Sequence, residues 1–510
     1  MQTERKPARD FAVPRLDALR STPDVGGIPQ PCELTRHTIV RPELTHNAMK
    51  TSLLMMVLHT LTLVAMLGTS GALAASTSIY HERLRYLTGI DSVLIAPYSQ
   101  WFMEGRDEKF YATFHHGYGY ASAIYRMNRD GSDLTLVRFD PTNRFEGIIM
   151  GMDGLLYGTL ASAPERGTPG IFRMAPDGSG FTMLKTFPPQ TAPRTGVIQD
   201  AEGWLYGTIF VGGDHGKGTV FKLSTNGLAF EWLHHFGSVT NDGQAPGRLM
   251  VGSDGALYGC TFYGGSVSNH GTVFRLARDG SSYSVLHRFD GSPQQGRYPL
   301  SDRPLLEASD GFLYHCADGG FNRAGVIFRV GKQGEDFRVI HQFQGDNGTG
   351  DSPIGGLVEW CDGSLYGTTI EGGIDGAGIV YRVNKNGSGF VALKVYIDSP
   401  NPGATDGSPR TPLIRGADHR LYGLTAGGSA ALGTLFRIDA WPSLDIRHTG
   451  ESIVVSWQEC AGTYNLQSSL DVCNHASWLP VAAPAQTVET QRQVTLPRTA
   501  DLRFFRLARP

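Results

Sequence analysis

The chain has 510 residues, of which 65 are glycine, and only 18 % of its residues are charged. The length exceeds one ordinary core and the glycine share is nearly double the usual share of about 7 %, which indicates several domains or a repeat architecture rich in short strands and tight turns. A formal net charge of -3 gives no field strong enough to attract nucleic acid or an anionic membrane, so we expect neither as a partner.

An apolar stretch near the N-terminus predicts a signal peptide over residues 49–74. Lys50 provides the basic start, residues 51–67 the apolar core, and Ala72-Leu73-Ala74 a small-x-small cleavage site. We therefore interpret residues 1–48 as a misannotated upstream extension or a disordered tail. The alternative is a cytoplasmic tail followed by a membrane anchor from Leu53 to Ala75. With cleavage, the mature protein is secreted, periplasmic or at the cell surface and keeps no stable membrane span.

A repeated unit covers most of the remaining chain, and a tyrosine after leucine marks its copies. Each full unit reads as four short strands, as in RLMVGSDG, ALYGCTFYGG, GTVFRLARDG and YSVLHRF. The spacing of roughly 50 residues matches one blade of a β-propeller. The tyrosine recurs at Tyr157, Tyr206, Tyr258, Tyr314, Tyr366 and Tyr422, with a degenerate earlier copy at Tyr111.

Turn chemistry supports the same division into strands. Asp-Gly or Asn-Gly pairs follow the first and third strands, as at Asp254-Gly255 and Asp279-Gly280. These pairs tolerate the positive φ of tight hairpin turns. Gly-Gly pairs end the second strand, as at Gly264-Gly265.

The last copy lacks a fourth strand after GTLFRIDA, whereas Glu82–Gly89 near the start has the fourth-strand pattern. Placing Leu84–Leu87 at the outer edge of the last copy would join the two ends of the array. We therefore expect an all-β fold, with a seven-bladed β-propeller over residues 75–440 that is closed by an N-terminal strand.

The combination of LYG-T, a double glycine, a Gly-Thr-Val-Phe-like strand and a Gly-x-x-Pro loop resembles the GloVer tandem repeat of secreted bacterial proteins. The resemblance covers residues from about 90 to 440. It implies a repeat-built extracellular module and no established activity. The family's apolar anchor and basic tail are missing from the ending RFFRLARP, which speaks against attachment through the C-terminus.

Residues 441–510 change to alternating strands and predict a small β-sandwich that resembles a fibronectin-like module. Trp457 and Trp478 lie in these strands, so we expect them to be core residues rather than sugar-stacking platforms. Cys460 and Cys473 either form a disulfide after export or remain two free thiols.

Most repeated polar residues are interpreted as scaffold. The repeated tyrosines are expected to pack between blades, and the fourth-strand histidines (His234, His235, His287 and His341) to be solvated residues that protect an exposed edge. No catalytic residue and no metal site is predicted from spacing, because no hydrolase elbow, zinc motif, phosphate loop or dinucleotide motif occurs in the required context.

The candidate binding residues lie in the loops between repeats. Asp242, Asp351 and Asp406 precede Gly or Ser in these loops and could bind calcium or glycan hydroxyls, although aspartate also initiates turns. His115 and His116 follow the degenerate second strand and are candidate pocket residues.

These features favour a noncatalytic, monomeric binding, adhesion or scaffold protein that takes a glycan or a protein ligand and needs no cofactor, with calcium as an option. The alternative is a propeller-fold polysaccharide lyase or glycoside hydrolase, which requires several carboxylates, or a His, Tyr and Arg group, to converge at the channel mouth.

Overall fold

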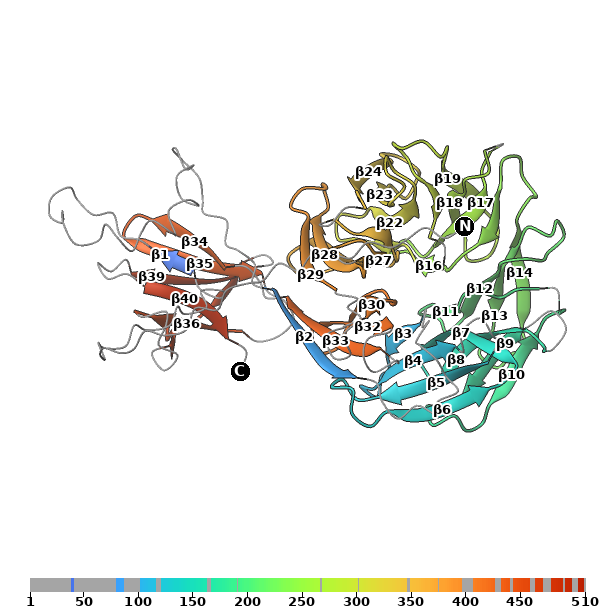
Figure 1. Ribbon diagram of the computed structural model, residues 1–510, viewed down its shortest axis with the longest axis horizontal. Coiled ribbons are helices and arrows are strands. Elements are labelled where there is room, and N and C mark those ends of the chain that lie inside the picture. The colour runs from blue at the N-terminus through green and yellow to red at the C-terminus, as the bar shows by residue number, and fades with distance from the viewer. Residues whose placement is uncertain are drawn as a thin grey trace, which may run out of the picture.

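Every regular element in the described part of the chain is a β-strand (Figure 1). The computed structural model describes residues 38–40, 79–86 and 101–508, the last range with gaps at 116–120, 163–166, 190, 267, 301, 346–348, 375, 397–406, 427–432, 441–443, 459–463, 471–477, 489–490 and 498–502. The predicted signal peptide lies outside the described residues. Within them, no helix is long and apolar enough to cross a membrane.

The repeat region forms seven antiparallel sheets within the described residues. Each begins with an inner strand, often split in two, and continues outward through three more strands. The first sheet comprises β3 (Phe102–Glu104), β4 (Phe110–His115), β5 (Ser122–Met127) and β6 (Thr135–Asp140); the second β7 (Asn143–Met150), β8 (Leu156–Ser162), β9 (Gly170–Met174) and β10 (Thr182–Thr186); the third β11 (Ile198–Gln199), β12 (Leu205–Ile209), β13 (Thr219–Leu223) and β14 (Phe230–His235).

The next three sheets have split inner strands. The fourth comprises β15 (Gly243–Pro246), β16 (Met250–Val251), β17 (Leu257–Gly264), β18 (Thr272–Leu276) and β19 (Tyr283–Arg288); the fifth β20 (Arg297–Pro299), β21 (Leu306–Glu307), β22 (Leu313–Asp318), β23 (Val326–Val330) and β24 (Arg338–Gln342); the sixth β25 (Asp351–Pro353), β26 (Val358–Glu359), β27 (Ser364–Glu371), β28 (Ile379–Asn384) and β29 (Val391–Val395).

The seventh sheet takes its outer strand from the beginning of the chain. It comprises β30 (Ser408–Pro409), β31 (Ile414–Arg415), β32 (Leu421–Ala426) and β33 (Thr434–Ala440), and β2 (Ile79–Tyr86) pairs antiparallel with β33 from Ile79↔Ala440 to Tyr86↔Thr434. The strand begins three residues earlier than the predicted Glu82 because β33 offers backbone partners as far as Ala440. Leu87–Gly89 lie outside the described residues.

The seven sheets share one register. In each, the repeat tyrosine of the second strand pairs with an inner-strand residue: Met103, Ile149, Ile198, Met250, Leu306, Val358 and Ile414 pair with Tyr111, Tyr157, Tyr206, Tyr258, Tyr314, Tyr366 and Tyr422. This common register places Tyr111, from the degenerate copy, in the same position as the other six.

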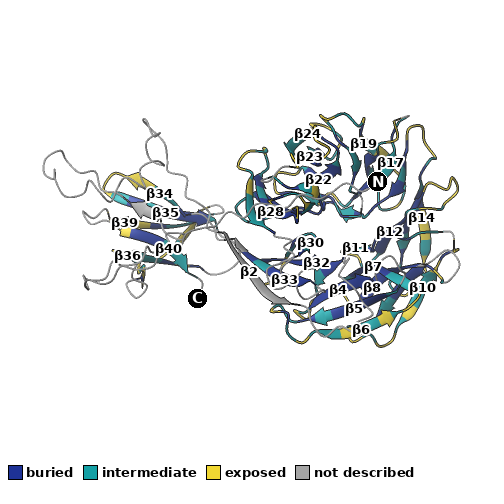
Figure 2. Cartoon of the chain, in the orientation of Figure 1, coloured by how far each residue is buried: buried dark blue, intermediate teal, exposed yellow. Residues whose placement is uncertain are grey.

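Apolar packing joins the sheets in a cycle. Tyr111 shares a buried cluster with Phe145 of the second sheet, and corresponding clusters join each sheet to the next as far as the seventh. Phe110 and Tyr422 then pack together, which joins the first sheet to the seventh. The second and third strands of the sheets are the most buried, as in β12 and β13, and the outer strands β6 and β10 are partly exposed (Figure 2).

The repeat tyrosines and the Asp-Gly turns stabilise each other. Tyr157 donates a hydrogen bond from its hydroxyl to Asp153 at 2.6 Å, and Tyr258 donates to Asp254 at 2.9 Å. The glycine after Asp153, Gly154, has φ 79°, which only glycine adopts without strain. A buried tyrosine hydroxyl needs a partner, so the turn aspartate meets a packing requirement as well as a turning one.

The C-terminal part contains two further sheets in the described residues. One comprises β34 (Leu444–Thr449), β35 (Ser452–Gln458), β38 (Gln486–Val488) and β39 (Gln491–Pro497); the other β36 (Asn465–Ser469), β37 (Leu479–Pro480), β40 (Arg503–Ala508) and, from the upstream segment, β1 (Thr38–Val40). Trp457 of the first sheet and Phe505 of the second lie in one buried apolar cluster. Trp478 is also buried, at 5 % exposure.

The cysteines fall into three groups. Cys260 and Cys316 are buried free thiols, and Cys361 is disulfide-bonded. Cys460 and Cys473 lie outside the described residues, so their pairing stays a prediction.

Candidate functional site

The structure places the predicted binding residues in different surroundings. Asp242 is buried, and its carboxylate accepts hydrogen bonds from Gly237 N at 2.7 Å, Tyr283 Oη at 2.5 Å and His234 Nε2 at 3.2 Å. Burial opposes ionisation, but these hydrogen bonds outweigh it and hold the pKa of Asp242 below its ordinary value. Asp242 therefore links β14, β19 and the loop between repeats.

The two other described candidates, Asp351 and His115, belong to other sheets than the residues that contact Asp242. Asp351 is half-buried at the start of β25 and accepts a hydrogen bond from Ser352 Oγ at 3.1 Å. His115 is buried at the end of β4, with its Nε2 3.1 Å from the carbonyl oxygen of Phe145, and burial lowers the pKa of His115 to about 4. Asp406 and His116 lie outside the described residues. A ligand-binding role for all five stays a prediction.

The fourth-strand histidines are less solvated than predicted. His287 stacks on Phe337 with ring centroids 3.4 Å apart, and His341 stacks on Phe390 at 4.0 Å. Burial lowers the pKa of both histidines to about 4. The expectation of a solvated edge is wrong for these residues, because each ring is covered by an aromatic ring of the next sheet. They remain part of the scaffold.

The common register identifies the residues that converge on the axis of the ring. In every sheet, the residue two positions before the inner-strand partner of the repeat tyrosine occupies the same level. These residues are Trp101, Gly147, Gly196, Arg248, Pro304, Gly356 and Pro412. This level is crowded: a Cβ atom added to Gly147 would lie 2.5 Å from Gly196 Cα and 2.6 Å from Trp101. Two large side chains, Trp101 and Arg248, therefore occupy a level at which most sheets provide glycine or proline.

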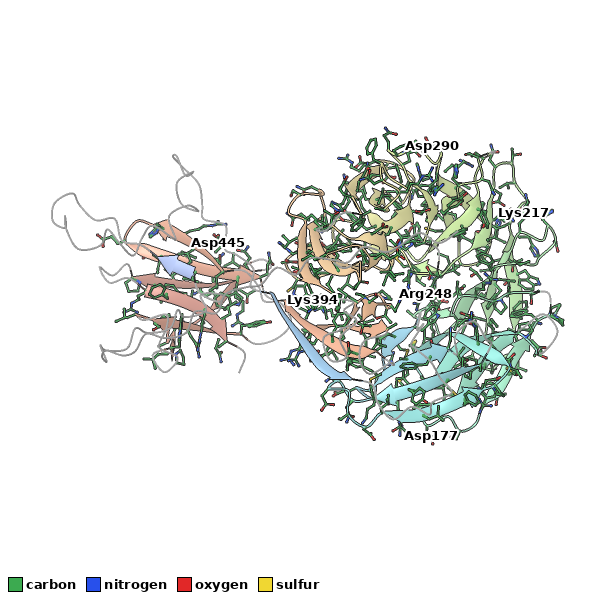
Figure 3. All side chains as sticks on the ribbon, in the orientation of Figure 1. Asp177, Lys217, Arg248, Asp290, Lys394 and Asp445 are labelled. Atoms are coloured by element: carbon green, nitrogen blue, oxygen red, sulfur yellow. The ribbon has the colours of Figure 1, made fainter. Side chains whose placement is uncertain are left out.

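Arg248 reaches across the axis from the fourth sheet to the first. Its guanidinium carbon lies 4.1 Å from the centroid of the Trp101 ring, a cation–π contact with a buried aromatic residue. Arg248 lies near the middle of the ring in Figure 3. Burial and the neighbouring charge of Arg303 lower the pKa of Arg248 to about 9.

Further charged side chains lie one or two residues before this level: Glu146, Arg194, Asp302 and Arg303. Together with Arg248, we call them the axial cluster. Glu146 and Arg303 are 7 % and 3 % exposed, so the protein removes much of their hydration. Within the described residues, neither Glu146 nor Asp302 forms an ion pair. These two carboxylates come from the second and fifth sheets, which are distant in sequence.

Electrostatics shows that the charges interact. Burial raises the pKa of Glu146 to about 7; Arg144 and Arg194 counteract the rise, and the negative charge of Asp302 adds to it. Burial also raises the pKa of Asp302, against the attraction of Arg303. The cluster thus presents two carboxyl groups with raised pKa values, that of Glu146 near neutral pH, beside guanidinium donors.

Hydroxyl groups fix the backbone around the axial cluster. Thr159 donates from Oγ1 to the carbonyl oxygen of Thr195 at 3.0 Å, and Thr208 donates to that of Gly247 at 2.9 Å. Each bond connects the second strand of one sheet to the inner strand of the next. The inner strands are therefore held at fixed positions, which suits a preformed site.

The described residues contain no cluster of metal-ligating side chains. Within the described residues, no group of three or more His, Cys, Asp or Glu side chains is arranged to hold a metal ion. Asp406 is not among those residues, so calcium binding at the loops stays a prediction.

Sequence reasoning missed the axial cluster. The signal was present as a departure from the repeat: after the proline of the Gly-x-x-Pro loop, the copies differ, with Arg194 in one, Arg248 in another and Asp302-Arg303 in a third. Aligning the copies on the tyrosine would have shown that these variable residues share one level.

The fold and the cluster define a class: an all-β, propeller-like repeat protein whose inner strands surround a charged axis. The chain belongs to the Gloeobacter/Verrucomicrobia repeat family, whose model matches residues 144–349 and 301–472. A comparison with curated proteins found no match.

Solved structures with similar chains include two lyases and one extracellular domain. Virginiamycin B lyase from Staphylococcus aureus is 12 % identical, with a TM-score of 0.44 over 71 % of this chain and 100 % of that one. Oligogalacturonate lyase from Vibrio parahaemolyticus is 10 % identical, with a TM-score of 0.47 over 72 % and 96 %. The extracellular domain of a one-component system from B. thetaiotaomicron is 11 % identical, with a TM-score of 0.44. The match covers 84 % of this chain and 55 % of that one.

Proposed function

We propose that the protein is an exported, noncatalytic binding protein: a seven-bladed β-propeller, closed by β2, that binds a carbohydrate at its axial cluster and carries a C-terminal β-sandwich. Cyclic packing of the seven sheets and the pairing of β2 with β33 support the closed ring. The signal-peptide pattern at residues 49–74 supports export. Attachment or partner recruitment through residues 441–510 would make the protein a scaffold as well.

One observation carries the binding proposal: carboxylates and guanidinium groups from separate sheets converge at the axis, and Glu146 and Asp302 have no ion-pair partner within the described residues. Carboxylates accept hydrogen bonds and guanidinium groups donate them, so together they can satisfy neighbouring sugar hydroxyls. Glu146 and Arg303 are already buried, and side chains held by packed strands lose little entropy when a ligand binds.

A glycan array, with and without calcium, tests this proposal. We expect the wild-type chain to bind a defined group of glycans, and Glu146→Gln and Arg194→Gln each to weaken that binding by about tenfold, the loss expected for one charge-assisted hydrogen bond. Asp351→Asn serves as the loop control. Binding that depends on Asp351 and calcium but not on Glu146 would move the site to the loops and refute the axial assignment.

A second function, polysaccharide lyase or glycoside hydrolase, is favoured by the raised pKa values of Glu146 and Asp302. Two carboxyl groups with raised pKa values can divide the roles of general acid and general base. Incubation with the glycans that bind, followed by chromatography of products, distinguishes the two functions. Product formation that Glu146→Gln and Asp302→Asn abolish, with binding retained, would establish the enzyme.

A further inference from the structure

A cavity of about 600 Å³ lies at the junction of the first and seventh sheets, apart from Glu146 and Asp302. Residues 102–106 of the first sheet and Ile414–Ala417 of the seventh form its walls, and Arg248 reaches it from the fourth sheet. Neither Glu146 nor Asp302 is among the residues that line it. Its volume is that of a typical small-molecule site.

The cavity has an excess of positive charge. Arg106, Arg248 and Arg415 line it together with His419. Within the described residues, none of these three arginines forms an ion pair. The one acidic side chain of the lining, Glu104, is already engaged: it accepts from Arg129 Nε at 2.5 Å and from Ala417 N at 2.6 Å.

Arg415 departs from the repeat at this position. In the fifth and sixth sheets the equivalent residues, Glu307 and Glu359, accept hydrogen bonds from Ser253 N at 2.7 Å and Ser309 N at 2.6 Å of the preceding sheet. An arginine has no acceptor atom and cannot make this bond. At this position, the seventh sheet therefore lacks the hydrogen bond to the preceding sheet and instead places a cation, Arg415, at the cavity.

Neutral contacts hold the arginines in place. Arg415 donates from Nη2 to His419 Nδ1 at 3.0 Å and lies 5.4 Å from the Trp360 ring, while Arg248 lies on Trp101. An arginine of a third strand instead pairs with a carboxylate, as Arg382 of β28 does with Asp362 at 3.0 Å. The cavity arginines thus keep their charge available.

We propose that this cavity binds a small organic anion, with a carboxylate or phosphate held by Arg106, Arg248 and Arg415 and its ring body against Phe102, Met103 and Ile414. Guanidinium groups match both anions through paired N–H donors. The apolar side chains give the remainder of the ligand a surface to cover. This site goes beyond the proposed carbohydrate site, because it uses different residues apart from Arg248 and selects for negative charge.

Isothermal titration calorimetry of the mature chain with D-glucuronate, D-glucose 6-phosphate and D-glucose tests the proposal. We expect at least one charged sugar to bind about tenfold more tightly than glucose, since one charge-assisted contact contributes about that factor. Comparison of the two charged sugars shows whether carboxylate or phosphate is preferred. Equal affinity for all three sugars, or no binding, would overturn the proposal.

Variants locate the site. Arg106→Gln and Arg415→Gln alter exposed side chains and should preserve the unfolding midpoint while each reduces charged-sugar affinity about fivefold to tenfold. Arg447→Gln, in the C-terminal part, is the matched control and should change nothing. Loss of binding in Arg194→Gln but not in the two cavity variants would place the anion at the axial cluster, which overturns the cavity proposal and leaves the proposed function standing.

Discussion

At the scale of single residues, the distinction between scaffold and site depends on whether a polar group already has its partners. Asp242 accepts from His234, Tyr283 and Gly237 N, whereas Glu146 is equally buried and forms no ion pair within the described residues. Both positions look alike in sequence, as single acidic residues near a repeat boundary. Because of their surroundings, the ionised form of Asp242 stabilises the folded state, whereas the ionised form of Glu146 destabilises it.

Glu146→Gln should stabilise the protein at alkaline pH. Because the pKa of Glu146 is raised from 4.5 to about 7, the folded state favours the protonated form; this contribution is complete below pH 4.5 and is lost as the pH rises through 7. The variant should gain up to about 3 kcal/mol over wild type at pH 8.5 and nothing at pH 4.5. Denaturant unfolding at both pH values measures this, with Glu231→Gln as an exposed control; an equal change at both pH values would contradict it.

Asp242→Ala should lower the free energy of unfolding by about 3 kcal/mol, because Tyr283 and His234 would lose a charged acceptor in a buried place. Asp351→Ala, at a half-buried position where the carboxylate accepts a hydrogen bond from Ser352, should cost less than about 1 kcal/mol. Thermal unfolding of the two variants measures the difference. Similar small effects would show that Asp242 is available for ligand binding instead.

At the scale of strands, the fourth-strand histidines and β2 show how neighbouring sheets depend on each other. His287 and His341 are covered by aromatic rings from the following sheet, and β2 covers the edge of β33. The sequence pattern of each strand indicates that it is an outer strand. It carries no information about which ring or edge lies beside it.

Stability should fall in acid, in part because of these histidines. The pKa values of His287 and His341 are lowered from 6.5 to about 4, so their contribution is present above pH 6.5 and is lost as the pH falls through 4. A His287→Phe/His341→Phe variant keeps aromatic stacking without a titrating group. Its unfolding midpoint should fall less than that of wild type between pH 7 and pH 4.5, and an identical fall would refute this account.

Deletion of residues 75–86 from the mature chain should expose β33 as a free edge. We expect a lower unfolding midpoint and association between copies, because an unpaired strand edge recruits other strands. Light scattering and thermal unfolding measure the two effects. The chain that begins at residue 75 is the control, and unchanged behaviour after deletion would show that β2 does not close the ring.

At the scale of the whole molecule, the predicted signal cleavage would determine which residues remain with the seven sheets. Cleavage after Ala74 would leave β2, which begins at Ile79, in the mature protein. N-terminal sequencing of protein from the culture medium or periplasm should begin at Ala75 or a near neighbour. Recovery of Met1 would contradict both the predicted signal peptide and the interpretation of residues 1–48.

The sequence by itself determined the elements and their register. The leucine-tyrosine pairs, the Asp-Gly turns and the missing fourth strand are local signals, because a turn or an alternating strand is specified by adjacent residues. They predicted an all-β repeat, its family and a pairing between the segment that begins at Glu82 and the last repeat. The repeat tyrosines were also correctly assigned to packing.

Only the tertiary structure brings together the charged residues on which the two proposed sites rest. Glu146, Arg194, Arg248 and Asp302 are far apart in the chain and meet because equivalent inner strands converge on one axis. The same convergence brings Arg106 and Arg415 together across the junction of the first and last sheets. Spacing along the chain contains no information about such contacts, since they depend on how the sheets pack around the axis.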